Sequence, residues 1–289
     1  MVFTTAVLGM NLLLQNAAFQ LSIPGMAKAP AAEKVLVKVN GIEIKAKDVE
    51  DLLWDTHGEE ILNEIMYYSV AKAESDKRGL VVTQQEVEQG VIREMDQMKQ
   101  SLANGQTIEE FMAQNGQTKN RLYLAVKTSL YLTKIAFQDF DPKAYVRVST
   151  IVVPPRSNSA EDVANTIKVV QNAYDRLQKG EPWSKLVDEL VTNQVGKQNR
   201  GLLGWRQLAA FPQSVQDEIK TLKKGGITKP VQTQNGIQIF RIEAKGDEVT
   251  KEEMDQMRIE LTDTLRVQAV QKLKENLKID RFYPATTGG

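Results

Sequence analysis

The chain has 289 residues, of which 42% are hydrophobic and 26% charged, and its 37 basic side chains balance its 37 acidic ones. This composition is typical of a globular protein of about two domains and argues against a disordered or fibrous chain. A net charge of zero gives no electrostatic basis for binding nucleic acid. Cysteine is absent and His57 is the only histidine, so disulfides, thiolate chemistry, multi-histidine metal sites and serine–histidine catalysis are excluded. We therefore expect no metal and no cofactor.

The N-terminal segment has a composition of its own. Residues 1–27 carry no charged side chain and contain a short apolar stretch, Val7–Leu14. Polar residues interrupt this stretch, which is shorter than the about 20 apolar residues of a membrane-spanning helix. We interpret residues 1–32 as a signal peptide or disordered segment with a cleavage region near Gly25–Ala32, which implies export to the cell envelope or periplasm. A loosely held apolar segment and an amphipathic segment that associates with a membrane remain as alternatives.

The next part of the chain is predicted to be a hairpin followed by helices. Val35–Lys45 alternates apolar and polar residues around Asn40-Gly41, a strong hairpin signal. Asp48 is expected to cap the first helix and His57-Gly58 to end it, which leaves His57 as a surface residue without a chemical role. Thr-x-x-Glu capping boxes begin at Thr83, Thr107 and Thr250. The helices expected before residue 138 are 48–54, 59–78, 84–103, 108–114 and 119–137.

The pattern changes at Asp141-Pro142, where proline disfavours further helix. Tyr145–Val153 is predicted to be a strand, and two further strands, 227–233 and 237–242, flank an Asn-Gly turn. The helices expected between them are 160–178, 183–191 and 212–222. This order predicts a compact α+β domain.

Helical segments flank the predicted α+β domain on both sides. The amphipathic helices of 46–137 and 251–278 each need a partner for their apolar face, so we expect them to pack together. The fold class is therefore α+β, a mainly helical lobe with an inserted domain. The expected boundaries are 33–142 plus 248–280 for the lobe, 143–247 for the inserted domain and 281–289 for a tail.

Five short stretches follow one another between residues 145 and 246. They are Val146–Val153, Lys179-Gly180-Glu181-Pro182-Trp183, Gly201-Leu202-Leu203-Gly204-Trp205, Leu222–Val231 and Thr233-Gln234-Asn235-Gly236. Together they resemble the parvulin-type prolyl isomerase domain over its full length. The stretch from Val39-Asn40-Gly41-Ile42 to Gly79–Thr83 is similar to the chaperone domain of PrsA-like and SurA-like foldases, in which a helical lobe is built from both sides of the parvulin insert.

The resemblance also implies the positions of the site residues. The parvulin family has a histidine on the first strand, a Cys or Asp after the second helix and another histidine on the last strand. These positions fall on Thr150, on Asn193 or its neighbour Thr192, and on Gln238. The apolar cup that holds the proline ring falls on Leu203, Phe211 and Val215. The alternative is ordinary hydrophobic core for the apolar residues and solvated or strand-facing positions for the polar ones.

Prolyl isomerisation makes and breaks no covalent bond. Its barrier is the partial double bond of the amide, about 18–20 kcal/mol, and an enzyme lowers it by binding the twisted amide better than the planar one. Thr150, Asn193 and Gln238 can hydrogen-bond a carbonyl, but they supply no titratable group. We therefore expect weak or absent isomerase activity.

Three hypotheses for function follow. The first is an exported foldase or holdase that binds unfolded, secretory or proline-containing client segments, and the second is an active isomerase that uses these altered polar residues. The third is a structural envelope protein that borrows the fold for docking. Methionines in the helical lobe fit a client surface or the core of the lobe, and they are Met66, Met95, Met98, Met112, Met254 and Met257. A homodimer and membrane association through the N-terminal segment are left open.

Overall fold

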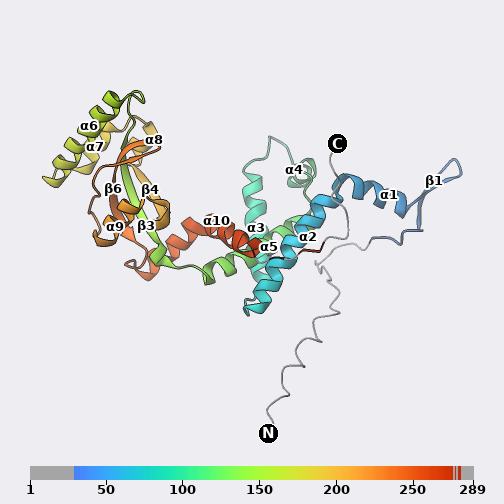
Figure 1. Cartoon of the computed structure of the whole chain (residues 1–289). Helices are drawn as coiled ribbons and strands as arrows, with labels where there is room; N and C mark the ends of the chain where they lie inside the picture. Colours follow the sequence, from blue (N-terminus) through green and yellow to red (C-terminus); the bar gives the residue numbers. More distant parts are fainter. Residues whose placement is uncertain (1–28, 276, 278, 281–289) are drawn as a thin grey trace, which may run out of the picture. The chain divides into compact units, whose positions relative to one another are not determined.

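A computed structural model describes residues 29–275 together with Leu277, Ile279 and Asp280 (Figure 1). The chain divides into two compact units, one made of residues 1–134 and 277–289 and the other of residues 135–276. Of the helices within the described residues, none combines the length and apolar character needed to cross a membrane. Residues 1–28 of the predicted N-terminal segment 1–32 and the predicted tail 281–289 lie outside the described residues.

The first unit begins with the predicted hairpin. β1 (Val35–Val39) pairs antiparallel with β2 (Ile42–Lys45), and Val39 lies opposite Ile42. Asn40 and Gly41 have φ values of 50° and 84°. A type I′ turn, which is common in two-residue hairpin loops, requires positive φ at both positions. All five residues of β1 are exposed, so this hairpin presents apolar side chains to solvent.

The first helical stretch does not end at His57-Gly58 as predicted. α1 (Ala46–Leu53) continues through a π-helical turn, Trp54–Gly58, into α2 (Glu59–Lys77). Gly58 has φ −57° and ψ −44°, which is right-handed helix, and a Cβ atom there would lie 2.2 Å from a ring carbon of Trp54. The prediction is wrong because this glycine makes room for the indole instead of supplying the positive φ that ends a helix.

The three predicted Thr-x-x-Glu caps are confirmed, and the predicted cap at Asp48 is wrong. The hydroxyls of Thr83, Thr107 and Thr250 accept hydrogen bonds from backbone N–H groups three residues on. Asp48 is not the N-cap of α1; it lies in the first turn and accepts a bond from the N–H of Lys45. The helices that follow α2 in the first unit are α3 (Gln84–Lys99), α4 (Ile108–Gln114) and α5 (Lys119–Gln138), whose last residues belong to the second unit.

Two apolar clusters hold the first unit together. Tyr68 and Ala71 of α2 pack with Leu124 and Tyr131 of α5. The other cluster joins α3, α4 and α5 through Val87, Met112, Leu122 and Val126, with Met95 and Met98 packed against it. The methionines at 95, 98 and 112 therefore belong to the core of this unit.

The second unit contains a four-stranded antiparallel sheet in the order β4-β3-β6-β5. β3 (Tyr145–Val153) has the predicted limits, and β6 (Gly236–Lys245) is longer than predicted. β5 is only Val231–Thr233, because the preceding stretch contains Pro230, which has no N–H to donate. β4 (Leu202–Gln207) was not predicted as a strand.

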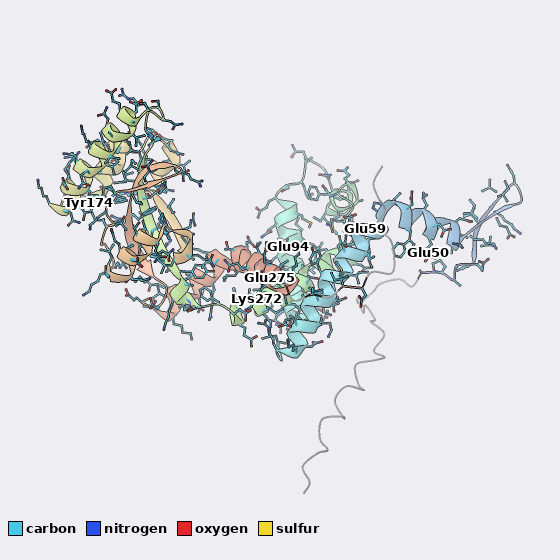
Figure 2. The ribbon with its side chains drawn as sticks, viewed as in Figure 1. Glu50, Glu59, Glu94, Tyr174, Lys272 and Glu275 are labelled. Atoms are coloured by element: carbon cyan, nitrogen blue, oxygen red, sulfur yellow. The ribbon has the colours of Figure 1, made fainter. Side chains whose placement is uncertain are left out.

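Helices cover both faces of this sheet (Figure 1). α6 (Ala160–Gln178) and α7 (Trp183–Leu190) pack on one face, and α9 (Gln213–Thr221) packs on the other. Tyr174 of α6, labelled in Figure 2, packs against the apolar cluster that α6 and α7 form with Ile151 and Ile239 of the sheet. A short helix, α8 (Gln194–Gln198), and two 3₁₀ turns, Pro142–Ala144 and Leu208–Ala210, complete the connections. The α+β fold class, with this domain inserted between helical segments, is confirmed.

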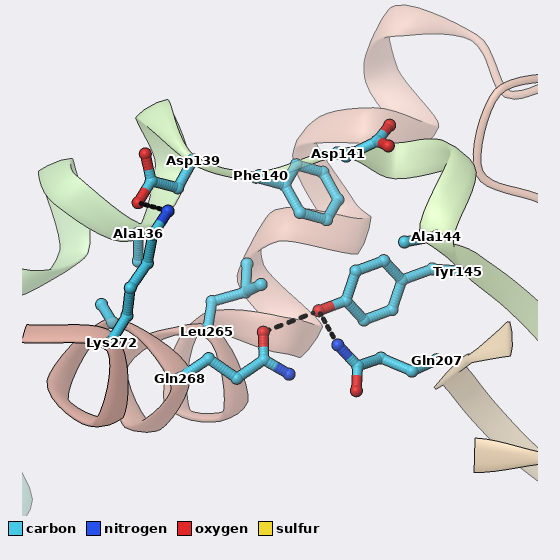
Figure 3. Close-up of a pocket in the computed structure, with 11 residues that line it drawn as sticks. Ala136, Asp139, Phe140, Asp141, Ala144, Tyr145, Gln207, Leu265, Gln268 and Lys272 are labelled. Carbon is cyan, nitrogen blue, oxygen red and sulfur yellow. Dashed lines mark hydrogen bonds and ion pairs between the residues drawn. The ribbon is translucent and has the colours of Figure 1, made fainter. Parts of the chain in front are cut away.

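The last helix, α10 (Lys251–Glu275), is held within the second unit by polar contacts and by buried apolar residues. The hydroxyl of Tyr145 donates to Oε1 of Gln268 at 3.0 Å, and Lys272 pairs with Asp139 at 2.9 Å. Figure 3 shows these contacts around a hollow of about 220 Å³ between α10, the end of α5 and the start of β3. Met257 of α10 is fully buried. The expected lobe of 33–142 with 248–280 stays a prediction.

Candidate functional site

The two central strands, β3 and β6, contribute side chains to both faces of the sheet. Side chains of successive strand residues point to opposite faces. Ile151 and Ile239 lie in the apolar cluster with α6 and α7, whereas Val148 and Phe240 lie in the cluster with α9. Thr150 alternates with Ile151, so its side chain lies on the α9 face.

Gln238 lies on this α9 face as well. It alternates with Ile239 on β6 and pairs with Val152 of β3, while Thr150 pairs with Phe240. Thr150 and Gln238 are therefore diagonal neighbours across the two strands. The structure thus brings together two of the three predicted polar positions.

Thr150 and Gln238 are nearly buried and differ in their bonding. Thr150 is 6% exposed, and its hydroxyl donates to the carbonyl of Ile239 at 3.2 Å. Gln238 is 7% exposed, and among the described residues its side-chain amide has no hydrogen-bond partner. Neither polar atom of this amide is a fully enclosed atom without a partner, so the Gln238 amide reaches solvent and is available to a ligand.

Asn193 has a different role in the structure. It is exposed and forms the N-cap of α8, where its Oδ1 accepts bonds from the N–H groups of Val195 at 2.8 Å and Gly196 at 3.2 Å. Thr192 is exposed beside it. Their assignment to the site stays a prediction, and the Asn193 oxygen is already engaged by the backbone.

The three predicted cup residues lie in one cluster. Phe211 and Val215 belong to the apolar cluster of the α9 face, and Leu203 of β4 packs against it. Phe211 meets Phe240 edge to face, with ring centres 5.1 Å apart at 84°. Phe211 is 9% exposed and Val215 is 2% exposed, so the cup is largely filled by its own side chains.

Two residues that sequence reasoning missed stabilise this cluster. Phe240 supplies the aromatic partner of Phe211, and Thr228, which is fully buried, accepts a hydrogen bond from the N–H of Phe240 at 3.1 Å. Thr228 also donates its own N–H to the carbonyl of Phe240. The apolar alternation of β6 marks Phe240 as a core residue, but no local signal marks Thr228, because its partner lies 12 residues away.

A glycine connects the loop after α8 to Thr150. The carbonyl of Gly201 accepts a bond from the N–H of Thr150 at 2.8 Å. Gly201 has φ 76°, and a Cβ atom there would lie 2.1 Å from the carbonyl oxygen of Thr150. Only glycine fits this close approach, so the loop at this residue packs directly against the backbone of β3.

The site is uncharged. Thr150, Gln238 and the apolar cluster contain no group that titrates between pH 2 and 12. Within the described residues, no cluster of three or more histidine, aspartate and glutamate side chains is arranged to hold a metal ion. The chemistry open to this face is therefore hydrogen bonding to a carbonyl and apolar contact, without general acid or base catalysis.

Comparison with known proteins agrees with this geometry. Residues 151–244 match the family model of the rotamase, or PPIC-type PPIase, domain. The chain is 24% identical over 246 residues to the foldase protein PrsA of Caldanaerobacter subterraneus subsp. tengcongensis, covering 76% of this chain and 72% of that protein. It is 27% identical over 113 residues to the chaperone SurA of Pseudomonas aeruginosa, a match that covers 37% of this chain and 26% of that protein.

A solved structure shows the same kind of likeness. The crystal structure of the peptidylprolyl isomerase PrsA from Bacillus cereus aligns with 88% of this chain and 95% of its own, at 20% identity and a TM-score of 0.42. The match to the family model makes residues 151–244 a PPIC-type PPIase domain. The chain as a whole is similar to the PrsA and SurA proteins, as the sequence resemblance implied.

Proposed function

We propose that this protein is an exported foldase or holdase whose parvulin domain has weak or no prolyl isomerase activity. The observation that carries the proposal is the neutral, nearly closed α9 face of the sheet. The family resemblance assigns Thr150 and Gln238 to the histidine positions of parvulins and Phe211 and Val215 to the proline cup, and all four side chains are buried or nearly buried. The likeness to proteins named foldase and chaperone supports a role in protein folding.

A surface for unfolded clients is available in the first unit. The hairpin and α1 expose apolar side chains that we call the N-terminal apolar patch, namely Leu36, Val37, Val39, Ile42, Val49, Leu52, Leu53 and Trp54. Ile42 is 71% exposed and Leu52 is 64% exposed. A run of exposed apolar residues of this size is typical of a protein-binding surface. Met95, Met98 and Met112 pack in the interior cluster of this unit and do not belong to the patch.

Suppression of client aggregation by the full chain tests the holdase role. The double substitution Ile42→Ser with Leu52→Ser is expected to weaken suppression strongly, because it removes the two largest exposures of the patch. Both side chains are exposed, so folding stability is expected to change by only about 0.5 kcal/mol. Val81→Ser is the matched control, since Val81 is 68% exposed outside the patch. Equal suppression by all three proteins would contradict this assignment.

The alternative function is an active isomerase with non-standard polar residues. It is favoured by one observation: within the part of the chain that the structure describes, the side-chain amide of Gln238 has no hydrogen-bond partner and keeps access to solvent. In a Michaelis complex this amide could donate to the carbonyl that precedes a client proline. Isomerisation of a proline tetrapeptide separates the two functions, because only the alternative predicts an acceleration that Gln238→Ala removes.

A further inference from the structure

The hollow beside α10 is separate from the predicted cup on the α9 face. It has a volume of about 220 Å³ and lies within the second unit, between the end of α5, the start of β3 and α10. Its lining includes none of the cup residues Leu203, Phe211 and Val215. This volume is below the about 300–1,000 Å³ of a typical small-molecule site, so the hollow has room for a small group.

The interior of the hollow is apolar. Ala136 of α5 and Leu265 and Ala269 of α10 are all buried and line it. The ring of Phe140 packs against that of Tyr145, with ring centres 5.4 Å apart. These side chains provide an apolar floor and an aromatic wall, against which an apolar group of a ligand leaves water.

Three polar side chains of the lining hydrogen-bond one another. The hydroxyl of the buried Tyr145 donates to Oε1 of Gln268 at 3.0 Å and accepts from Nε2 of Gln207 at 3.4 Å. Among the residues that the structure describes, Nε2 of Gln268 and Oε1 of Gln207 have no hydrogen-bond partner. Figure 3 shows these two atoms on the sides of the amides that face away from the hydroxyl. The hollow therefore offers one free donor and one free acceptor, and the same phenol orients both.

The charged groups of the lining leave one negative charge unbalanced. Lys272 is paired with Asp139 at 2.9 Å. Asp141 is exposed, and within the described part of the chain its carboxylate accepts a hydrogen bond only from the backbone N–H of Lys143, at 3.0 Å. This balance disfavours an acidic ligand and permits a neutral or basic one.

We propose that the hollow binds one residue of an extended, neutral or basic peptide segment. A peptide chain carries an N–H donor and a C=O acceptor at each residue, which complement the free oxygen of Gln207 and the free nitrogen of Gln268. The side chain of the bound residue then lies on the floor formed by Leu265 and Ala269. Proline is not required, so this ligand differs from that of the predicted cup.

This subsite is additional to the N-terminal apolar patch. It deepens the proposed folding role and rests on that role only for the source of the ligand, because unfolded clients expose such segments. Binding of a peptide in the hollow and suppression of aggregation by the patch are separate measurements, so either can fail without the other.

The experiment is an NMR titration of the full chain, labelled with ¹⁵N and with ¹³C at its methyl groups, with acetyl-Gly-Leu-Gly-amide. This probe is neutral and contains no proline. We expect saturable shifts of the side-chain amide signals of Gln207 and Gln268 and of the methyl signals of Ala136 and Ala269, with one dissociation constant. Acetyl-Asp-Leu-Asp-amide is expected to bind severalfold more weakly, because of the unbalanced carboxylate of Asp141.

Two substitutions test the hydrogen bonds. Gln268→Leu removes the donor at similar size and is expected to raise the dissociation constant about twofold to tenfold. Gln207→Leu removes the acceptor at an exposed position and is expected to have a similar effect, which keeps the test valid if Gln268→Leu does not fold. Gln271→Leu is the matched control, since Gln271 is exposed on the same helix and is not part of the lining. It is expected to bind the peptide as the wild type does.

Three outcomes would overturn the proposal. The first is a peptide that shifts signals elsewhere but none from the hollow, a result that needs no variant. The second is the absence of any shift up to millimolar peptide, and the third is one dissociation constant shared by the wild type and both glutamine variants. Any of these, with suppression of client aggregation retained, contradicts the hollow alone. Loss of suppression with binding in the hollow retained would instead support the hollow and contradict the folding role.

Discussion

Thr150 and Gln238 occupy neighbouring positions on the α9 face, and neither can exchange a proton at ordinary pH. The Thr150 hydroxyl donates to the carbonyl of Ile239, whereas the Gln238 amide has no hydrogen-bond partner among residues 29–275, 277, 279 and 280. Any contribution of this face to isomerisation must therefore come from the Gln238 amide and from apolar contact with the proline ring. Such contact requires room, and Phe211 and Val215 are buried.

Gly201 is the residue that most restricts the backbone beside Thr150. Gly201→Ala is expected to destabilise the protein by at least about 1–3 kcal/mol, because the methyl group would meet the Thr150 carbonyl oxygen at 2.1 Å. Gly225→Ala is the matched control, since Gly225 has φ 85° but open space around its Cβ position. Both substitutions strain the backbone, but only Gly201→Ala adds a steric clash. The difference between their free energies of unfolding in urea therefore measures the clash alone. Equal losses would show that the contact with Thr150 is unimportant.

At the scale of elements, local signals account for what was predicted. The Asn40-Gly41 hairpin and the Thr83 and Thr107 caps depend on residues within four positions of one another, so sequence alone determines them. The limits of α6 were predicted for the same reason, with Ser159 as its cap.

The elements that were missed depend on distant partners. β4 contains Gly204 and polar residues, and it is a strand because it pairs with β3, which lies more than 50 residues earlier. The role of Gly58 depends on where the Trp54 indole lies. The cup positions followed from family resemblance, but their burial depends on Phe240 of the last strand, which no local pattern connects to Phe211.

The junction of α6 and α7 carries a charge network with a defined dependence on pH. Arg176 donates to both carboxylate oxygens of Glu181, at 2.7 and 2.9 Å, and also to Glu189. The hydrogen bonds from Arg176, followed by that from Lys185, lower the pKa of Glu181 to about 2. The stability from this carboxylate is present above its ordinary pKa of 4.5 and is lost as pH falls from there toward 2.

Thermal unfolding of Arg176→Met and the wild type from pH 6 to pH 2 checks this dependence. The variant is expected to be less stable at pH 6. The difference in unfolding temperature between the variant and the wild type is expected to narrow as pH falls below about 4.5. Glu181→Gln should show the same narrowing, because it removes the titrating group. A gap that stays constant over this range would contradict the ion-pair account.

At the scale of the whole molecule, the export hypothesis concerns residues outside the described part of the chain. A cleaved signal predicts that the mature protein recovered from an extracytoplasmic fraction begins between residues 25 and 32. N-terminal sequencing of that protein checks the prediction directly. Recovery of the chain in the cytoplasm with its first residue intact would contradict export and leave the folding role to act on cytoplasmic clients.

The two compact units are expected to have different functions. The first unit exposes the N-terminal apolar patch, whereas the second contains the parvulin sheet and the buried side chains of Phe211 and Val215, which the family resemblance assigns to the cup. Client binding is therefore expected to depend on the first unit and to survive substitutions in the cup. Isomerase activity, if the alternative holds, is expected to depend only on the second.

The most direct test of the central claim is the rate of cis–trans isomerisation of a proline tetrapeptide in the presence of the full chain. The account predicts relaxation at the uncatalysed pace of about 10–100 s, with no further slowing in Phe211→Ala or Gln238→Ala. A strong acceleration by the wild type that either substitution abolishes, while both variants remain folded, would contradict the claim and establish an active isomerase.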